Sequence, residues 1–391
     1  MFKDHTVSKF KSIPTPFYYY DTEVLKQTLT ALKKESDKYD FIVHYALKAN
    51  TENKILGIIR SFGIGADCVS GNEIKKALEC KFESDDIVFA GVGKSDAEIN
   101  FALDNNIFCF NCESIQEIEV INELAAAKNK TAHIALRINP NVNAHTHKYI
   151  TTGLEENKFG INLWELEAVV NVLKKLKNIK LIGLHFHIGS QITDLSAYKT
   201  LCTKVNELQH WFETHHIQIE NINVGGGLGV DYHEPDTNGI ASFEAYFKIF
   251  NDFLEVRPNQ KVHFELGRAI VAQCGSLISR VLYIKKGVNT NFAILDAGMT
   301  ELMRPALYQA YHKIENLTKQ TQDSSLKTQD YKYDIVGPIC ESSDCFGKAV
   351  ELPETFRGDI FALRTAGAYG AVMSSEYNLR EKAKAVFSDE I

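Results

Sequence analysis

The chain has 391 residues, enough for two or three domains and most simply two. Its 45% hydrophobic and 24% charged residues are ordinary for a globular protein with a sizeable core. The 43 Lys and Arg against 50 Asp and Glu give a net charge of −7 without basic clusters, which argues against nucleic-acid or anionic-membrane partners. No apolar run approaches the ~20 residues that span a bilayer, and residues 1–12 lack an apolar leader core, so we expect a cytoplasmic protein.

The eight cysteines are expected to be reduced thiols, because a long chain without export signals does not need a disulfide framework. Cys109 and Cys112 have CxxC spacing. We interpret them as part of the core at the end of a strand, with a redox motif as the less favoured alternative.

Short apolar runs predict a series of strands along the chain. A first strand at residues 15–20 precedes eight others, which are mostly continuous in their apolar character, as expected for parallel strands covered on both faces. The eight predicted strands cover residues 41–46, 66–69, 87–90, 107–110, 133–138, 181–187, 222–224 and 262–265.

Helical patterns lie between these strands. Helices are predicted at residues 53–62, 164–177 and 197–212, and two others begin at capping sequences, Ser95 with Glu98 and Ser114 with Glu117. Eight strands that alternate with helices over ~250 residues predict a (β/α)8 barrel of the TIM type.

After Gly267 the pattern changes to strands separated by turns, with little helix. The strands are predicted at residues 277–284, 292–296, 333–336 and 360–363, and residues 315–330 are polar and predicted to form a loop. We therefore expect an all-β second domain, a Greek-key barrel or sandwich that also takes up the N-terminal strand. The predicted domains are residues 22–267, and residues 1–21 with 268–391.

Polar residues gather where the barrel strands end, which is where TIM-type barrels place their chemistry. Lys48, His187 and Glu265 each stand at a strand end, and Gly225, Gly226 and Gly227 follow another strand. His185 with His187, or His145 with His147, would be a metal pair only with further ligands, and no partner motif accompanies them. We therefore expect no metal and favour one functional and one packed histidine.

These strand-end residues match the needs of one cofactor, pyridoxal phosphate. A partly buried amine such as Lys48 is a nucleophile toward carbonyls and can form a Schiff base. The backbone N–H groups of a glycine turn can hold a phosphate. A carboxylate such as Glu265 can keep a pyridine nitrogen protonated, and His187 can stack on an aromatic ring.

With these motifs in place, the sequence resembles the fold-type III pyridoxal-phosphate decarboxylases, and within them the diaminopimelate decarboxylases. The resemblance covers nearly the whole chain, including residues 15–21, 45–50, 65–71, 185–191, 225–227, 303–308, 337–342, 367–369 and 376–378. One departure is Leu266, where the family usually has proline before Gly267. We expect a slightly softer phosphate loop there, because proline would fix φ.

The resemblance implies roles for residues around the cofactor. Lys48 binds it covalently, Glu265 faces the pyridinium nitrogen, His187 stacks on the ring and Asp67 lies behind Lys48. The phosphate is held by residues named in the family motifs: Gly225, Gly226, Gly227, Ser190, Gly267, Arg268 and Tyr369.

The resemblance also implies a reaction and a substrate: loss of CO2 from meso-2,6-diaminopimelate to give L-lysine, the last step of lysine biosynthesis. Cys340 is the proton donor, and Arg268 and Arg304 bind the distal carboxylate. The distal ammonium is bound by Glu341, and Tyr308 and Tyr369 complete the pocket. Because Cys340 and Glu341 reach the site from the partner chain in this family, the expected assembly is a homodimer with shared active sites.

Other readings remain open at this point. Arg268 and Arg304 would repel the second cationic group of ornithine or arginine, but carboxynorspermidine also carries a carboxylate and is harder to exclude. An alanine racemase shares the fold but needs a tyrosine base, whereas Tyr308 and Tyr369 stand in decarboxylase-like contexts. A non-catalytic pyridoxal-phosphate carrier would resemble the barrel alone and would not need Cys340 or Glu341.

Overall fold

The computed structural model describes residues 2–142, 158–320 and 330–391. The chain divides into two compact units. The barrel unit comprises residues 29–229 and 242–267, and the β unit comprises residues 1–28, 230–241 and 268–391. Segment 230–241 thus leaves the barrel sequence and packs with the β unit, which the linear sequence did not indicate.

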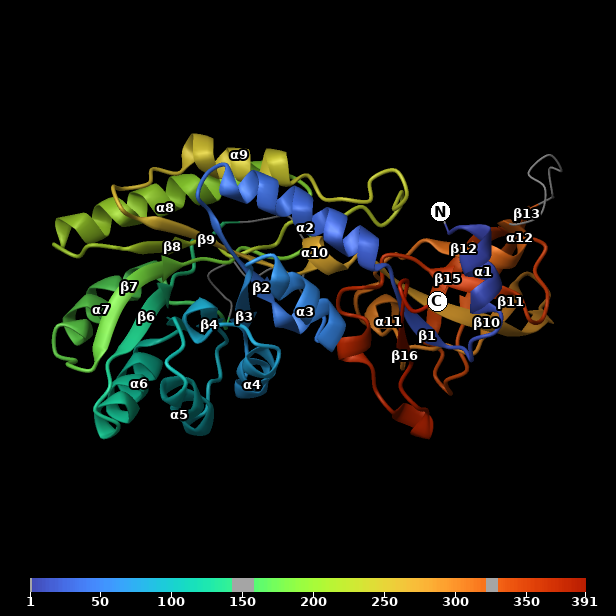
Figure 1. The fold of residues 1–391 in the computed structure, drawn as a ribbon, viewed down its shortest axis with the longest axis horizontal. Helices are drawn as coiled ribbons and strands as arrows, with labels where there is room; N and C mark the ends of the chain where they lie inside the picture. The colour runs from blue at the N-terminus through green and yellow to red at the C-terminus, as the bar shows by residue number, and fades with distance from the viewer. Residues whose placement is uncertain (1, 143–157, 321–329) are drawn as a thin grey trace. The chain divides into compact units, whose positions relative to one another are not determined.

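The barrel unit is a closed ring of eight parallel strands, so the predicted barrel is confirmed. Figure 1 shows helices on the outside of these strands. The strands are β2 (Ile42–Ala46), β3 (Gly65–Cys68), β4 (Ile87–Phe89), β5 (Cys109–Cys112), β6 (Ala132–Arg137), β7 (Ile179–His185), β8 (Asn221–Asn223) and β9 (Lys261–Leu266). The ring closes where β2 pairs with β9, with His44 opposite Glu265.

Helices alternate with the barrel strands, as the sequence pattern predicts. They are α2 (Thr22–Asp37), which also runs into the β unit, α3 (Asn53–Ser61), α4 (Gly71–Glu79), α5 (Asp96–Asp104), α6 (Ile115–Ala127), α7 (Leu166–Leu173), α8 (Ser196–Thr214) and α9 (Phe243–Phe253). Three predicted elements differ in their bounds. The strand β5 begins later than residue 107, β7 ends at His185 and not at residue 187, and the helix predicted at 164–177 is a 3-10 turn (Leu163–Glu165) followed by α7.

The capping sequences explain where two of these helices begin. Ser95 and Glu98 form the predicted capping box at α5, since each side chain accepts a hydrogen bond from the other's backbone N–H. At α6 the Ser114 side chain accepts from Glu117 N, but the Glu117 side chain accepts from Glu113 N at 2.7 Å. The second half of the predicted box is therefore shifted by one residue.

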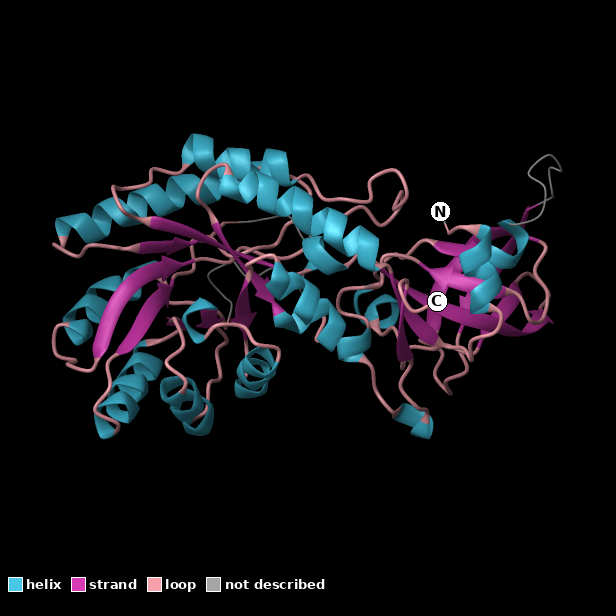
Figure 2. Ribbon diagram, viewed as in Figure 1, coloured by secondary structure: helices cyan, strands magenta, loops and turns pink. Residues whose placement is uncertain are grey.

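The β unit is built on an eight-stranded mixed sheet, and Figure 2 shows how short its helices are. Its strands are β1 (Phe17–Tyr20), β10 (Gly275–Lys286), β11 (Asn291–Leu295), β12 (Ile314–Asn316), β13 (Asp330–Val336), β14 (Cys345–Pro353), β15 (Ile360–Leu363) and β16 (Lys384–Phe387). Its helices are α1 (Asp4–Phe10), α10 (Arg268–Val271), α11 (Arg304–Tyr308) and α12 (Leu317–Gln320). The N-terminal strand β1 pairs with β10 and β16, so its predicted place in this domain is confirmed.

Part of the polar stretch predicted as a loop at residues 315–330 is ordered. Its first residues belong to β12 and α12, because Ile314 and Leu317 are buried and β12 pairs with β15. Residues 321–329 lie outside the described part of the chain. Within the described ranges, no helix has both the length and the apolar character needed to cross a bilayer.

Candidate active site

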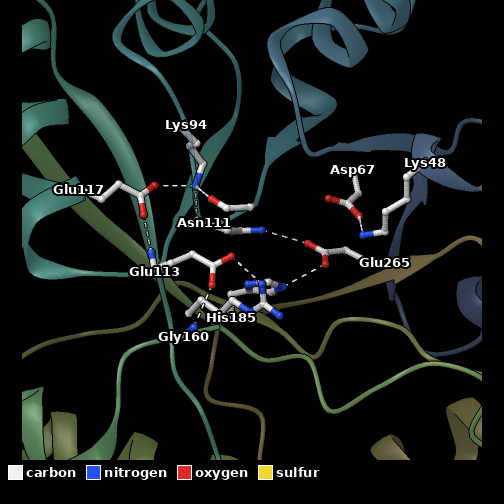
Figure 3. Close-up of polar contacts among 11 residues, drawn as sticks. Lys48, Asp67, Lys94, Asn111, Glu113, Glu117, Gly160, His185 and Glu265 are labelled. Atoms are coloured by element: carbon white, nitrogen blue, oxygen red, sulfur yellow. Dashed lines mark hydrogen bonds and ion pairs between the residues drawn. The ribbon is translucent and has the colours of Figure 1, made fainter. Parts of the chain in front are cut away.

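Figure 3 shows Lys48 and Asp67 facing each other. Lys48 lies in a 3-10 turn (Leu47–Ala49) directly after β2, and Asp67 is in β3. Lys48 Nζ is 3.5 Å from Asp67 Oδ2, and the Lys48 side chain is 39% exposed while that of Asp67 is 1% exposed. The lysine amine is therefore accessible to a ligand, whereas its carboxylate neighbour is not.

The surroundings of Asp67 disfavour the ionised form of its carboxyl group. Burial, followed by the nearby Glu265, raises the pKa of Asp67 to about 7, although Lys48 acts in the opposite direction. Its Oδ1 is buried and has no hydrogen-bond partner among the described residues. An unsatisfied carboxylate oxygen beside the lysine is an opening for a ligand donor.

Glu265 is the buried carboxylate at the centre of the barrel unit. Its Oε1 accepts from Asn223 Nδ2 at 2.7 Å and from Asn111 Nδ2 at 3.0 Å, and its Oε2 is 3.0 Å from His185 Nε2. Burial alone would raise the pKa of Glu265, but His185 above all, followed by Lys48, holds it below the usual range. Glu265 is therefore an ionised carboxylate inside the barrel.

The glycine turn is tied to this carboxylate through Asn223. Asn223 donates to Glu265 through Nδ2 and accepts from Gly225 N through Oδ1 at 2.9 Å. The turn requires glycine: Gly225 and Gly227 have φ of +69° and +94°, and a Cβ on Gly226 would collide with the carbonyl oxygen of Glu265. From the sequence, we expected these glycines because they let the backbone approach an anion. The structure adds a second reason, which is the close packing of the turn against the backbone of Glu265.

His187 follows β7, and burial, with Arg137 and Lys48, lowers its pKa well below the usual value. Its Nδ1 accepts from Gly226 N at 3.4 Å, so the ring is a neutral imidazole with its proton on Nε2. His185 is not simply a packed histidine as expected, because it bonds to Glu265. Among the described residues no cluster of three or more His, Cys, Asp or Glu could hold a metal, and His145 and His147 lie outside the described residues.

A buried network of paired charges supports the strand ends next to this site. Lys94 Nζ bonds to Glu117 Oε1 at 2.5 Å and also donates to the Asn111 carbonyl at 2.9 Å. Arg137 Nη1 bonds to Glu113 Oε1 at 2.6 Å. Figure 3 shows the Lys94 and Glu117 pair beside Asn111. The network fixes Asn111, and therefore one of the donors to Glu265.

The β unit holds two buried arginines, Arg268 and Arg304, with 7% and 5% exposure. Arg268 Nη1 donates to Tyr232 Oη at 2.6 Å, and its guanidinium lies 4.8 Å from the Tyr369 ring centroid. Burial alone would lower the pKa of Arg268, but the surrounding tyrosines, including Tyr308, raise it. The structure thus gathers Arg268, Arg304, Tyr308 and Tyr369 in one cluster.

Cys340 and Glu341 lie on a loop between β13 and β14. Both are exposed in the single chain. Glu341 Oε1 accepts from Tyr377 Oη at 3.0 Å, and Cys340 N is 3.4 Å from Asn378 Oδ1. All eight cysteines are free, and burial raises the pKa of the Cys109 and Cys112 thiols, which is unlike a reactive CxxC pair.

The remaining predicted residues are Ser190 and Gly267. Ser190 lies in the turn after β7 and is half-buried, and Gly267 follows β9 and is buried. The sequence reasoning missed Asn111, Asn223, Tyr232 and His312. Asn111 and Asn223 had a signal, because an amide in an apolar strand must find a buried hydrogen bond. Tyr232 and His312 had none, since only the fold brings them to the arginines.

The barrel residues fit pyridoxal phosphate. An accessible lysine amine, an ionised buried carboxylate, a neutral imidazole and a glycine turn lie at neighbouring strand ends. These are the groups needed to attach the cofactor, hold its ring nitrogen, contact its ring and receive its phosphate.

Comparisons with known proteins agree with this fit. Residues 23–272 match the family described as pyridoxal-dependent decarboxylase, pyridoxal binding domain. A diaminopimelate decarboxylase of Bacteroides thetaiotaomicron is 58% identical over 98% of this chain and 98% of its own.

Two solved structures extend the likeness to the whole fold. The diaminopimelate decarboxylase of Helicobacter pylori complexed with L-lysine has a TM-score of 0.89 and 39% identity over 97% of this chain and 93% of its own. The M. jannaschii enzyme in co-complex with L-lysine has a TM-score of 0.88 and 34% identity over 98% and 89%. The chain belongs to the diaminopimelate decarboxylase family of pyridoxal-dependent decarboxylases.

Proposed function

We propose that the chain converts meso-2,6-diaminopimelate to L-lysine and CO2 with pyridoxal phosphate, as the last step of lysine biosynthesis. The observation that carries this choice of substrate is the buried arginine pair in the β unit. Arg304 forms no ion pair with a carboxylate in the described ranges, and it lies close enough to Arg268 to feel its charge. Two adjacent buried cations are costly unless an anionic ligand joins them.

The barrel residues would bind and tune the cofactor. When bound, pyridoxal phosphate supplies an electron-withdrawing ring that takes up the electron pair left by departing CO2. Glu265 would keep the ring nitrogen protonated, Lys48 would be the covalent attachment point, and neutral His187 would contact the ring face. Asp67 would accept a hydrogen bond or a proton beside Lys48, because its Oδ1 is open.

The phosphate would be bound by backbone groups of Gly225–Gly227 and Gly267, with Ser190, Arg268 and Tyr369 as further donors. Asn223 supports this assignment, because it bonds to both Gly225 and Glu265 and so fixes the distance between the phosphate turn and the ring-nitrogen partner. Leu266 occupies its position buried within β9, which supports a turn that does not need proline.

The β unit would bind the end of the substrate that does not react. Arg268 and Arg304 would bind the distal carboxylate, Glu341 would take the distal ammonium, and Tyr308 with Tyr369 would complete the pocket. The H. pylori and M. jannaschii relatives were solved with L-lysine. The α-carboxylate of this product is the distal carboxylate of the substrate, so lysine is expected to occupy the same arginines.

Cys340 would protonate the carbon that loses CO2, from Sγ, and it would do so in a partner subunit. The exposure of Cys340 and Glu341 in the single chain supports this homodimer with shared sites. We propose accordingly that residues 22–267 carry the cofactor, that residues 1–21 and 268–391 carry substrate and dimer contacts, and that the protein works in the cytoplasm.

The test is CO2 release by the purified holoenzyme from meso-diaminopimelate, with ornithine, arginine and carboxynorspermidine in parallel. We expect release from meso-diaminopimelate alone, with lysine as product. Release from another amine would keep the Lys48 chemistry but contradict the roles of Arg268 and Arg304. No release from any of them would favour a pyridoxal-phosphate carrier.

A further inference from the structure

The two buried arginines of the β unit, Arg268 and Arg304, each contact uncharged side chains. Arg304 Nη1 contacts His312 Nε2 at 2.8 Å, and its guanidinium lies 4.9 Å from the Tyr232 ring centroid. Arg268 Nη1 donates to the hydroxyl of the same tyrosine. Tyr232 therefore touches both guanidinium groups, one with its ring and the other with its oxygen.

The protonation state of His312 follows from its two contacts. Its Nδ1 is 2.8 Å from the Arg364 carbonyl oxygen, which only accepts, so Nδ1 carries the proton. Its Nε2 faces the Arg304 guanidinium, which only donates, so Nε2 is unprotonated and accepts the hydrogen bond. A second proton on this ring would break the Arg304 contact, and burial with the adjacent Arg304 lowers the pKa of His312 to about 3.

His312 and Tyr232 orient Arg304 without cancelling its charge, and no carboxylate of the described residues pairs with it. Tyr232 and His312 also pack against each other edge to face, with ring centroids 5.3 Å apart. An acidic residue in the place of His312 would hold Arg304 equally well, but it would compete with any anionic ligand for the same guanidinium. A neutral acceptor gives the orientation and leaves the positive charge for the ligand.

We propose that Tyr232 and His312 are positioning residues that make Arg268 and Arg304 a preformed receptor for one carboxylate. This inference rests on the proposed function, since the carboxylate it selects is the distal one of the substrate. It goes further by assigning the selectivity to two uncharged side chains that do not contact the reacting carbon.

The test compares His312→Gln with His312→Glu in the holoenzyme. Both replacements place an acceptor oxygen near Arg304 on side chains of nearly equal size. They differ in charge, and only the glutamine amide can still donate to the Arg364 carbonyl. Two ligands provide the matched probes: L-lysine and cadaverine share the same pair of amines and differ by one carboxylate. Binding is measured by calorimetry, and KM and kcat are measured for meso-diaminopimelate.

We expect His312→Glu to raise the KM for meso-diaminopimelate and the Kd for lysine by about 10-fold or more relative to His312→Gln. The Kd for cadaverine and kcat should differ little between the two variants, because the charge acts on the carboxylate end. Equal lysine affinities in the two variants would overturn the proposal. Equal losses for lysine and cadaverine would also overturn it, because they would indicate a general structural effect.

Tyr232→Phe is the second variant, and it keeps the ring against Arg304 while removing the acceptor for Arg268. It should weaken lysine binding by about 10-fold, the usual cost of a hydrogen bond to a charged group, and leave cadaverine unchanged. Unchanged lysine binding would contradict the role of Tyr232. If lysine still discriminates between the His312 variants but no CO2 leaves meso-diaminopimelate, the proposed function fails and the carboxylate receptor stands.

Discussion

The barrel unit and the β unit each bury a charged side chain. The buried anion of the barrel is surrounded by hydrogen-bond donors, and the buried cation of the β unit by an acceptor and a ring face. In the barrel, the Glu265 anion is surrounded by the donors Asn111, Asn223 and His185. In the β unit, the Arg304 cation is surrounded by His312, an acceptor, and the ring face of Tyr232. The partners of Arg304 are uncharged, whereas Glu265 is held by two amides and also by the charges of His185 and Lys48.

A third region shows the opposite treatment. Lys94 with Glu117, and Arg137 with Glu113, are buried ion pairs in which each charge meets its opposite within the chain. Such pairs are expected to support structure, because no charge is left over for a ligand. The kind of partner, rather than burial alone, therefore separates a ligand site from a structural network.

The largest expected effect comes from removing the barrel anion. Glu265→Gln keeps the shape of the side chain but loses the charge that would keep the cofactor nitrogen protonated. We expect kcat to fall by about 100-fold or more, the usual scale for loss of one electrostatic contact to the reacting system. The variant should still bind the cofactor, which its visible absorbance will report. Wild-type kcat in this variant would remove Glu265 from the chemistry.

The matched substitution in the paired network should change stability instead. Glu117→Gln leaves the Lys94 ammonium, whose side chain is 1% exposed, without its counter-charge. We expect the free energy of unfolding to fall by about 3 kcal/mol, with kcat largely retained, as measured by denaturant titration and steady-state kinetics. A loss of kcat as large as that of Glu265→Gln would erase the distinction between the two kinds of buried charge.

A pH effect is expected from Asp67. Its folded pKa of about 7 lies above the unfolded value of 3.8, so its contribution to stability is complete below 3.8 and is lost as pH rises through 7. At pH 6 this contribution amounts to about 1.4 kcal/mol, and it is nearly absent at pH 8.5. The cofactor-free wild type should lose this much stability between the two pH values relative to Asp67→Asn. Parallel pH profiles for the two proteins would contradict the assignment.

The smallest expected effect comes from the hydroxyl of Tyr246, which differs from that of Tyr232 in its hydrogen bonding. Tyr246 Oη is buried and has no hydrogen-bond partner among the described residues. Tyr246→Phe should therefore raise the free energy of unfolding by up to about 1 kcal/mol. Denaturant titration checks this value, and a destabilised variant would show that the hydroxyl has a partner after all.

Much of the fold could be predicted from the sequence, because the barrel strands are buried on both faces and form continuous apolar runs. The missed strands β12, β14 and β16 each pair with a single neighbour and lie at edges of the sheet. Edge strands carry weaker apolar patterns, and only two of the nine residues of β14 are buried. The stretch after residue 314 looked like a loop for the same reason.

The site could be predicted only in part. Lys48, His187 and Glu265 stand at strand ends, and the barrel topology alone places such residues at one rim. Tyr232 and His312 are far from each other in sequence, and neither belongs to the motifs that contain Arg268 and Arg304. Segment 230–241, which contains Tyr232, joins the β unit only through tertiary packing. Partners that act through another side chain therefore remain invisible until the fold is known.

Arg304 is proposed to bind the carboxylate of the ligand, because no carboxylate of the described residues neutralises its charge. The most direct measurement is the ratio of the Kd for cadaverine to the Kd for L-lysine, in wild-type holoenzyme and in Arg304→Met. The account predicts that the substitution weakens lysine binding by about 100-fold while cadaverine binds as before, so the ratio collapses. An unchanged ratio would contradict the account, because Arg304 would then recognise no carboxylate.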